Sequence, residues 1–167
     1  MSLRIWMAGQ YENTHENRMV SAAIEVLQNA LADAEDTYHL VCCFTVPGYS
    51  SRYRSNIDLA VIKPGGMMIV EMKDYTGPID YGDEGEWYCE LISGGIKEIK
   101  GGNNGRSPYR QVSDYRQQCR RLIERQQLSF LQPEDAGKRQ FNARNWVSAM
   151  VLFPDVPEGT RPDTPTF

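Results

Sequence analysis

Apolar residues recur at helical spacing in two separate segments of the chain. The first segment begins at Thr14, a residue type favoured at helix N-caps, and continues to about Asp33. The second begins near Ser107-Pro108, where proline suits the first helical turn, and continues to about Leu128. Their apolar stripes consist of Val20, Ala23, Ile24, Leu27 and Leu31, and of Val112, Tyr115, Cys119, Leu122 and Ile123. We therefore expect two amphipathic helices, each with one face packed against the rest of the protein.

Between and after these helices, short runs of apolar and β-branched residues indicate strands. The runs are residues 38–46, 56–63, 67–73, 87–92, 96–100 and 145–153, the last of which reads as a buried strand. Pro64-Gly65 and Ser93-Gly94-Gly95 are turn sequences, so they predict two hairpins. The order helix, strands, helix, strand predicts an α/β protein with a central mixed β-sheet flanked by helices.

The first predicted hairpin carries a distinctive set of charges. If Pro64-Gly65 forms a two-residue turn, the register places Asp58 opposite Glu71, and Lys73 two residues further along the same face. A turn with an odd number of residues would instead place the two carboxylates on opposite faces. Opposed residues have Cβ atoms about 5 Å apart, so the two negative charges repel unless something compensates them. Mg²⁺ prefers carboxylate oxygens as ligands, so the pair is a candidate metal site.

From the residues alone, two interpretations of these charges stay open. Asp58 and Lys73 could form a surface ion pair, which would contribute about 0–1 kcal/mol. The hairpin is, however, apolar on both faces, and charges in such a buried strand pair are costly without an ion or a partner. We expect one face to hold Ile57, Leu59, Val61, Met68, Val70 and Met72, and the other to hold Ala60, Ile62 and Ile69.

Other polar residues could serve the same site. Glu16 could stabilise the N-terminus of the first helix through its dipole, or it could supply a third carboxylate. Gln111 borders the apolar stripe of the second helix, one turn before Tyr115. The arginines of that helix fit a solvated face as well as a phosphate site. The candidate ligands for a substrate phosphate are Arg52, Arg54, Arg106, Arg110 and Tyr115.

Composition and charge limit the classes of function. The chain has 167 residues, 41% of them hydrophobic, which is enough for one domain with its own core. Its net charge of −4 gives no global attraction to nucleic acid, so such binding would depend on a local basic patch or a metal ion. No apolar run is long enough to span a membrane and no signal peptide is evident, so we expect a cytoplasmic protein without membrane contact. The 4 cysteines lack a Cys-x-x-Cys spacing and are expected to be reduced thiols.

Three segments of the chain differ in character. Residues 1–12 are expected to be an N-terminal extension, in which Met1-Ser2-Leu3 resembles an expression scar. Residues 13–153 are expected to form the folded domain. Residues 154–167 are rich in proline and are expected to be a tail or linker, so a further domain beyond residue 167 is expected in a longer native protein.

The charged hairpin and the second helix resemble a known family. The residues that carry the resemblance, in chain order, are Glu16, Asn56-Ile57-Asp58-Leu59-Ala60-Val61, Gly65-Gly66, Ile69-Val70-Glu71-Met72-Lys73-Asp74-Tyr75-Thr76-Gly77, Trp87 and Ser107-Pro108-Tyr109-Arg110-Gln111. From about Glu16 to Phe153 the chain resembles the nuclease-related domain (NERD) family of the PD-(D/E)XK nuclease superfamily. The resemblance implies a restriction-endonuclease-like core.

The resemblance also implies roles for the matching residues. Asp58 and Glu71 would be ligands of Mg²⁺ or Mn²⁺, together with the backbone carbonyl of Met72. Lys73 would be the catalytic lysine that assists hydrolysis of a phosphodiester. Glu16 matches the acid of the family's first helix and would be a further metal ligand.

Gln111 matches the glutamine of the family's second helix and is expected to be catalytic, and with Tyr115 it is similar to the Gln-x-x-x-Tyr motif of RecB-type nucleases. Ser107-Pro108 stands where family members often have Asn-Pro, and residues 80–86 form an acidic run that would repel DNA if it faced the cleft. The function predicted is metal-dependent hydrolysis of phosphodiester bonds in DNA. The alternatives are a non-catalytic module that keeps the nuclease fold and binds nucleic acid or protein, and a structural domain that regulates an attached enzyme.

Overall fold

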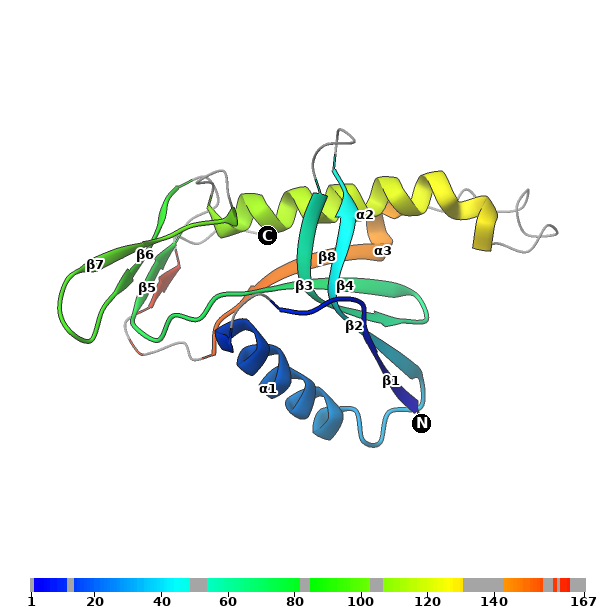
Figure 1. Cartoon of the computed structure of the whole chain (residues 1–167), viewed down its shortest axis with the longest axis horizontal. Helices are drawn as coiled ribbons and strands as arrows, with labels where there is room; N and C mark the ends of the chain where they lie inside the picture. The colour runs from blue at the N-terminus through cyan, green and yellow to red at the C-terminus, as the bar shows by residue number, and fades with distance from the viewer. Residues whose placement is uncertain are drawn as a thin grey trace.

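The computed structural model describes residues 2–11, 14–48, 54–81, 85–102, 107–130, 143–154, 158 and 160–162. Its elements are β1 (Ser2–Met7), α1 (Thr14–Ala30), β2 (Thr37–Pro47), β3 (Arg54–Lys63), β4 (Gly66–Met72), β5 (Ile79–Tyr81), β6 (Trp87–Glu90), β7 (Ile96–Ile99), α2 (Pro108–Phe130), α3 (Ala143–Trp146), β8 (Val147–Leu152) and β9 (Arg161–Pro162). Figure 1 shows their arrangement in space.

Within the described residues the strands form two sheets. The larger sheet has the order β1-β2-β3-β4-β8 and the smaller one the order β7-β6-β5-β9. The larger sheet is mixed, because β1–β2 and β4–β8 are parallel pairs whereas β2–β3 and β3–β4 are antiparallel. The smaller sheet lies at one end of the molecule, on the left in Figure 1. The predicted α/β fold with a mixed sheet flanked by helices is confirmed.

Each of the two long helices covers one face of the larger sheet. On the α1 face, Met19 and Val20 pack in one cluster with Leu59 and Val70 of the central hairpin. On the α2 face, Tyr115 and Cys119 pack with Ala60, Met67, Ile69 and Val147. Figure 1 shows the two helices on opposite sides of the strands. Because both faces are covered, any charge on the central strands lies in a largely dry environment unless a cavity admits water.

The central hairpin has the predicted turn and register. Lys63 pairs with Gly66 across Pro64-Gly65, and the pairs continue in step to Leu59 and Val70. Gly65 has a φ of 89°, a conformation that glycine adopts without strain and that follows proline in type II turns. The turn therefore contains two residues, and the requirement for an even count is met.

One step beyond those pairs the strand geometry becomes irregular. Cys42 pairs with Leu59 and Phe44 pairs with Ile57, and between these two pairs Cys43 has a φ of 49°, outside the range of a regular strand. Ile57 belongs to the cluster under α2, whereas Leu59 belongs to the cluster under α1. The prediction that Ile57 shares a face with Leu59 is therefore wrong, because the irregular position interrupts the simple alternation of a pleated strand.

Several element boundaries also differ from the prediction. The first helix ends at Ala30, three residues early, and 145–146 belong to the short helix α3 instead of a strand. The strand that follows, β8, lies at the edge of the larger sheet, and of its residues only Val147 is fully buried, so the expectation of a buried strand is wrong. Leu122 is 37% exposed although it lies in the predicted stripe. The neighbouring Ile123 packs against the cluster under α2 instead.

Three strands were not predicted from the sequence. Ser2–Met7, expected within an N-terminal extension, forms β1 and pairs with β2 at one edge of the larger sheet. Ile79–Tyr81 and Arg161–Pro162 form β5 and β9, which are only 3 and 2 residues long. Such short strands show too little periodicity to be recognised in a sequence.

No helix in the described part of the chain is long and apolar enough to cross a membrane. The cytoplasmic location stays a prediction. The four cysteines, all among the described residues, form no disulfide, and three of them are buried.

Candidate active site

Asp58 is held where the pairing between β3 and β4 ends. Its Oδ2 accepts a hydrogen bond of 2.8 Å from the backbone N–H of Met72. Its backbone carbonyl accepts a second hydrogen bond, also 2.8 Å long, from the hydroxyl of Tyr11. Asp58 therefore has contacts to β4 and to the segment that follows β1, and both its main chain and its carboxylate are positioned.

Glu71 and Lys73, both at the end of β4, form a largely buried ion pair. The Nζ of Lys73 lies 2.7 Å from Oε1 of Glu71, and the two side chains are 13% and 6% exposed. The residues are two positions apart, so a strand directs both side chains to the same face. A short charge-assisted hydrogen bond in this environment holds the ammonium group beside the carboxylate.

Burial sets the electrostatics of the two carboxylates. Burial, with smaller contributions from the charges of Glu71 and Glu16, raises the pKa of Asp58 from 3.8 to about 7, although the Met72 N–H and Lys73 act to lower it. Burial also raises the pKa of Glu71, while Lys73 opposes the shift. The site thus holds two carboxyl groups whose ionisation is costly without additional positive charge, which is the condition under which a cation binds.

The first two turns of α2 supply the opposite wall. The Nε2 of Gln111 donates a 2.6 Å hydrogen bond to the hydroxyl of Tyr115, and the Gln111 side chain also hydrogen-bonds Glu71, which lowers the pKa of that carboxyl. The Oε1 of Gln111 is buried and has no hydrogen-bond partner among the described residues. An unused buried acceptor is costly, so this oxygen is suited to a water molecule or an ion in the site.

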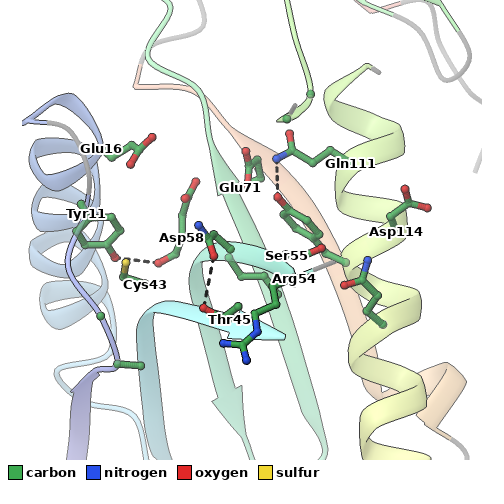
Figure 2. A pocket seen from close by; sticks show the side chains of 18 of the residues that line it. Tyr11, Glu16, Cys43, Thr45, Arg54, Ser55, Asp58, Glu71, Gln111 and Asp114 are labelled. Carbon is green, nitrogen blue, oxygen red and sulfur yellow. Dashed lines mark hydrogen bonds between the residues drawn. The ribbon is translucent and has the colours of Figure 1, made fainter. Parts of the chain in front are cut away.

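These residues line one cavity of about 780 Å³. Figure 2 shows Asp58 and Glu71 between Glu16 on α1 and Gln111 on α2. The full lining consists of Ala8, Gly9, Gln10, Tyr11, Glu16, Cys43, Thr45, Gly48, Arg54, Ser55, Asn56, Ile57, Asp58, Glu71, Lys73, Gly101, Gly102, Gln111, Asp114, Tyr115 and Gln118. The structure therefore brings together Glu16, Asp58, Glu71, Lys73, Gln111 and Tyr115 from elements far apart in the sequence.

The predicted phosphate ligands have different outcomes. Arg54 lines the cavity, although its side chain is largely exposed. Arg110 is exposed on α2 and does not line the cavity in the described part of the protein. Arg52 and Arg106 lie outside the described residues.

The lining fits a hard divalent cation. Two carboxylates and the unpartnered amide oxygen of Gln111 are oxygen donors, the ligand type that Mg²⁺ and Mn²⁺ prefer. Within the described residues, no group of three or more His, Cys, Asp or Glu side chains is arranged to hold a metal ion. An ion here would therefore depend on Asp58 and Glu71, with water or backbone oxygens such as the Met72 carbonyl completing its ligands.

Sequence reasoning missed part of the lining. Tyr11 was not recognised, although its hydroxyl contacts Asp58 from a position 47 residues away. Asp114 and Gln118 were also missed, and their spacing on α2 from Gln111 is the signal that could have found them, because positions three and four apart share a helix face. No sequence signal pointed to Cys43 or Gly102, whose places depend on how the chain folds back.

A mixed sheet covered by helices, with two carboxylates and a lysine at the end of its central hairpin, defines a nuclease-like α/β protein. The chain belongs to the nuclease-related domain (NERD) family, whose model matches residues 14–154. No curated protein and no solved structure matches the chain. Membership suggests a nuclease-related function, interaction with nucleic acid and a divalent metal cofactor.

Proposed function

We propose that this protein hydrolyses phosphodiester bonds in DNA with Mg²⁺ or Mn²⁺, at the site formed by Asp58, Glu71 and Lys73. The observation that carries the proposal is the placement of all three side chains in one cavity, with the Lys73 ammonium 2.7 Å from Glu71. A buried acid pair with raised pKa values gains most from a cation, whereas a structural role would be met by an apolar pair at lower cost.

Each residue of the site would have a distinct role in hydrolysis. When bound, a divalent cation would supply Lewis-acid activation of the phosphate and of a water molecule. Asp58 and Glu71 would hold that ion, since their oxygens are fixed by Met72 and Lys73. Lys73 would hold the attacking water or neutralise the charge that develops on the phosphate, a role suited to a compact ammonium group.

The α2 side of the cavity would orient the reacting groups. Tyr115 receives the Nε2 hydrogen bond of Gln111, so the amide is fixed and its Oε1 is available to accept a hydrogen bond from a water molecule. Arg54, at the cavity lining, adds positive charge where a phosphate would enter. Arg110 is exposed on α2 and would contact the substrate outside the cavity.

The test is metal binding by calorimetry together with plasmid nicking, on the wild type and on Asp58→Asn. Asparagine keeps the shape of the side chain and removes only its charge, so loss of both binding and nicking in this variant would support the proposal. Asp33→Asn is the matched control, because Asp33 is exposed and does not line the cavity. Nicking that persists in Asp58→Asn would overturn the proposed site.

The same experiment separates the alternatives. Wild-type protein that binds DNA without nicking it, and binds no Mg²⁺ or Mn²⁺ at millimolar concentrations, would indicate a non-catalytic nucleic-acid-binding module. Parallel reactions with supercoiled plasmid, circular single-stranded DNA and RNA would define the substrate.

A further inference from the structure

The N-terminal segment before α1 forms one wall of the candidate active site. Ala8, Gly9, Gln10 and Tyr11 all line the cavity. The segment lies outside residues 14–154, which the family model matches. The segment is anchored by β1, which pairs in parallel with β2 from Ser2 to Met7. The backbone N–H of Ala8 then donates a 3.0 Å hydrogen bond to the carbonyl of Cys42. The chain thus arrives at the site along the edge of the larger sheet.

The approach of this segment to β2 is close. A Cβ atom at Gly9 would lie 2.7 Å from the backbone oxygen of Cys43 and 3.3 Å from its Sγ. Only glycine permits this contact without a shift of one backbone away from the other. Cys43 is also the residue with a φ of 49°, so the segment meets β2 where the strand is irregular.

Tyr11 contacts Asp58 at the same irregularity. The pairs between β2 and β3 omit Cys43 and Asp58, and those between β3 and β4 end at Leu59. At this position the Asp58 carbonyl accepts a hydrogen bond from the Tyr11 hydroxyl. Figure 2 shows Tyr11 reaching Asp58 from the side of α1.

The Tyr11 side chain is well suited to hold a fixed position. Its ring packs against the cluster under α1 that contains Met19 and Val20. Burial raises the pKa of Tyr11, so the hydroxyl remains a donor throughout the range in which enzymes work. A fixed aromatic donor restrains the main chain of Asp58, while the Met72 N–H restrains its carboxylate.

We propose that Tyr11 is a positioning residue of the active site: through its hydrogen bond to the Asp58 carbonyl, the N-terminal segment holds Asp58 in the geometry required for metal binding and hydrolysis. The inference rests on the proposed nuclease function. It gives a role in that function to the N-terminal segment, which lies outside the residues that the family model matches. A loss of Tyr11 would leave every metal ligand present but one of them poorly placed, which affects the transition state more than the binding of DNA.

The experiment compares Tyr11→Phe, which removes only the hydroxyl, with Tyr38→Phe as the matched control. Tyr38 is a half-buried tyrosine on β2 that does not line the cavity. We expect kcat for plasmid nicking to fall roughly three- to tenfold in Tyr11→Phe, the factor that one hydrogen bond provides, with KM for DNA unchanged. The Met72 amide signal in ¹H–¹⁵N spectra should shift in Tyr11→Phe, because its partner Asp58 moves, and should stay in place in Tyr38→Phe.

Gly9→Ala is a second variant that displaces the segment and keeps the hydroxyl, and it should lower kcat in the same direction. If the wild type is active and Tyr11→Phe has the same kcat and an unshifted Met72 signal, this inference is overturned and the proposed function stays intact. A fall in kcat that Tyr38→Phe shares would also overturn it, because the effect would then be general. A wild type that neither binds metal nor nicks DNA would overturn the proposed function itself, and the role of Tyr11 with it.

Discussion

Replacing Asp58 by asparagine should stabilise the metal-free protein at neutral pH. Burial and the neighbouring Glu71 charge raise the pKa of Asp58 from 3.8 to about 7. Between these two pH values the unfolded chain has released the Asp58 proton while the folded protein still holds it. Because the folded state binds more protons, the free energy of unfolding falls as pH rises through this window.

The size of the effect follows from the pKa shift. A shift of roughly 3 units at about 1.4 kcal/mol each corresponds to at most about 4 kcal/mol of stability lost by the wild type above pH 7. Asparagine does not titrate, and its side-chain oxygen can still accept the hydrogen bond from Met72. We therefore expect the free energy of unfolding of Asp58→Asn to exceed that of the wild type by about 2–4 kcal/mol at pH 7.5 and to equal it near pH 4.

Urea denaturation in the presence of a chelator measures this difference. With a urea dependence of about 2 kcal/mol per molar, the midpoint of Asp58→Asn should lie about 1–2 M above that of the wild type at pH 7.5. Mg²⁺ should reduce the gap, since 10 mM of an ion with a dissociation constant of about 1 mM would stabilise only the wild type, by about 1.4 kcal/mol. Asp33→Asn should change neither value.

Two results would refute this reasoning. If Asp58→Asn unfolds at lower urea than the wild type at pH 7.5, the ionised carboxylate is already compensated by Lys73 and Met72, and the site has no need of an ion. If the difference between the two proteins is the same at pH 4 and pH 7.5, Asp58 does not titrate in this window.

Three further outcomes are expected. Lys73→Met should lower the rate of nicking by about a hundredfold or more. It should also destabilise the protein at neutral pH, because Glu71 loses its ion-pair partner. Mg²⁺ binding that is retained in calorimetry would show that the loss of activity is catalytic, and full activity would show that Lys73 has no catalytic role. Gln111→Leu should cost about 1–3 kcal/mol in urea denaturation, because the Tyr115 hydroxyl loses its partner, and an unchanged midpoint would contradict that contact. Gly77→Ala should lower the melting temperature by several degrees, because a Cβ would overlap a backbone carbonyl of β6, and an unshifted transition would contradict the close approach.

The family resemblance and much of the site could be predicted because their signals are local. The hairpin register depends on a two-residue turn and a period of two, so Asp58, Glu71 and Lys73 could be placed at one end of the hairpin. The positions of Glu16 and Gln111 depended on the family resemblance, which the match to residues 14–154 confirms. The predicted face of Ile57 was wrong because no local sequence pattern indicates the irregular backbone at Cys43.

The sequence by itself determined the two helices and the central hairpin with its two-residue turn, since each of these depends on neighbours a few residues apart. Only the tertiary structure decided which helix covers each face of the hairpin, that Lys73 pairs with a buried Glu71, and that Tyr11 holds the Asp58 carbonyl. These features join residues from different elements, and their energies come from burial and hydrogen bonds between segments. The pattern of residues along the sequence does not show which distant segments will contact one another, so the cavity and its electrostatics can be described only from the folded structure.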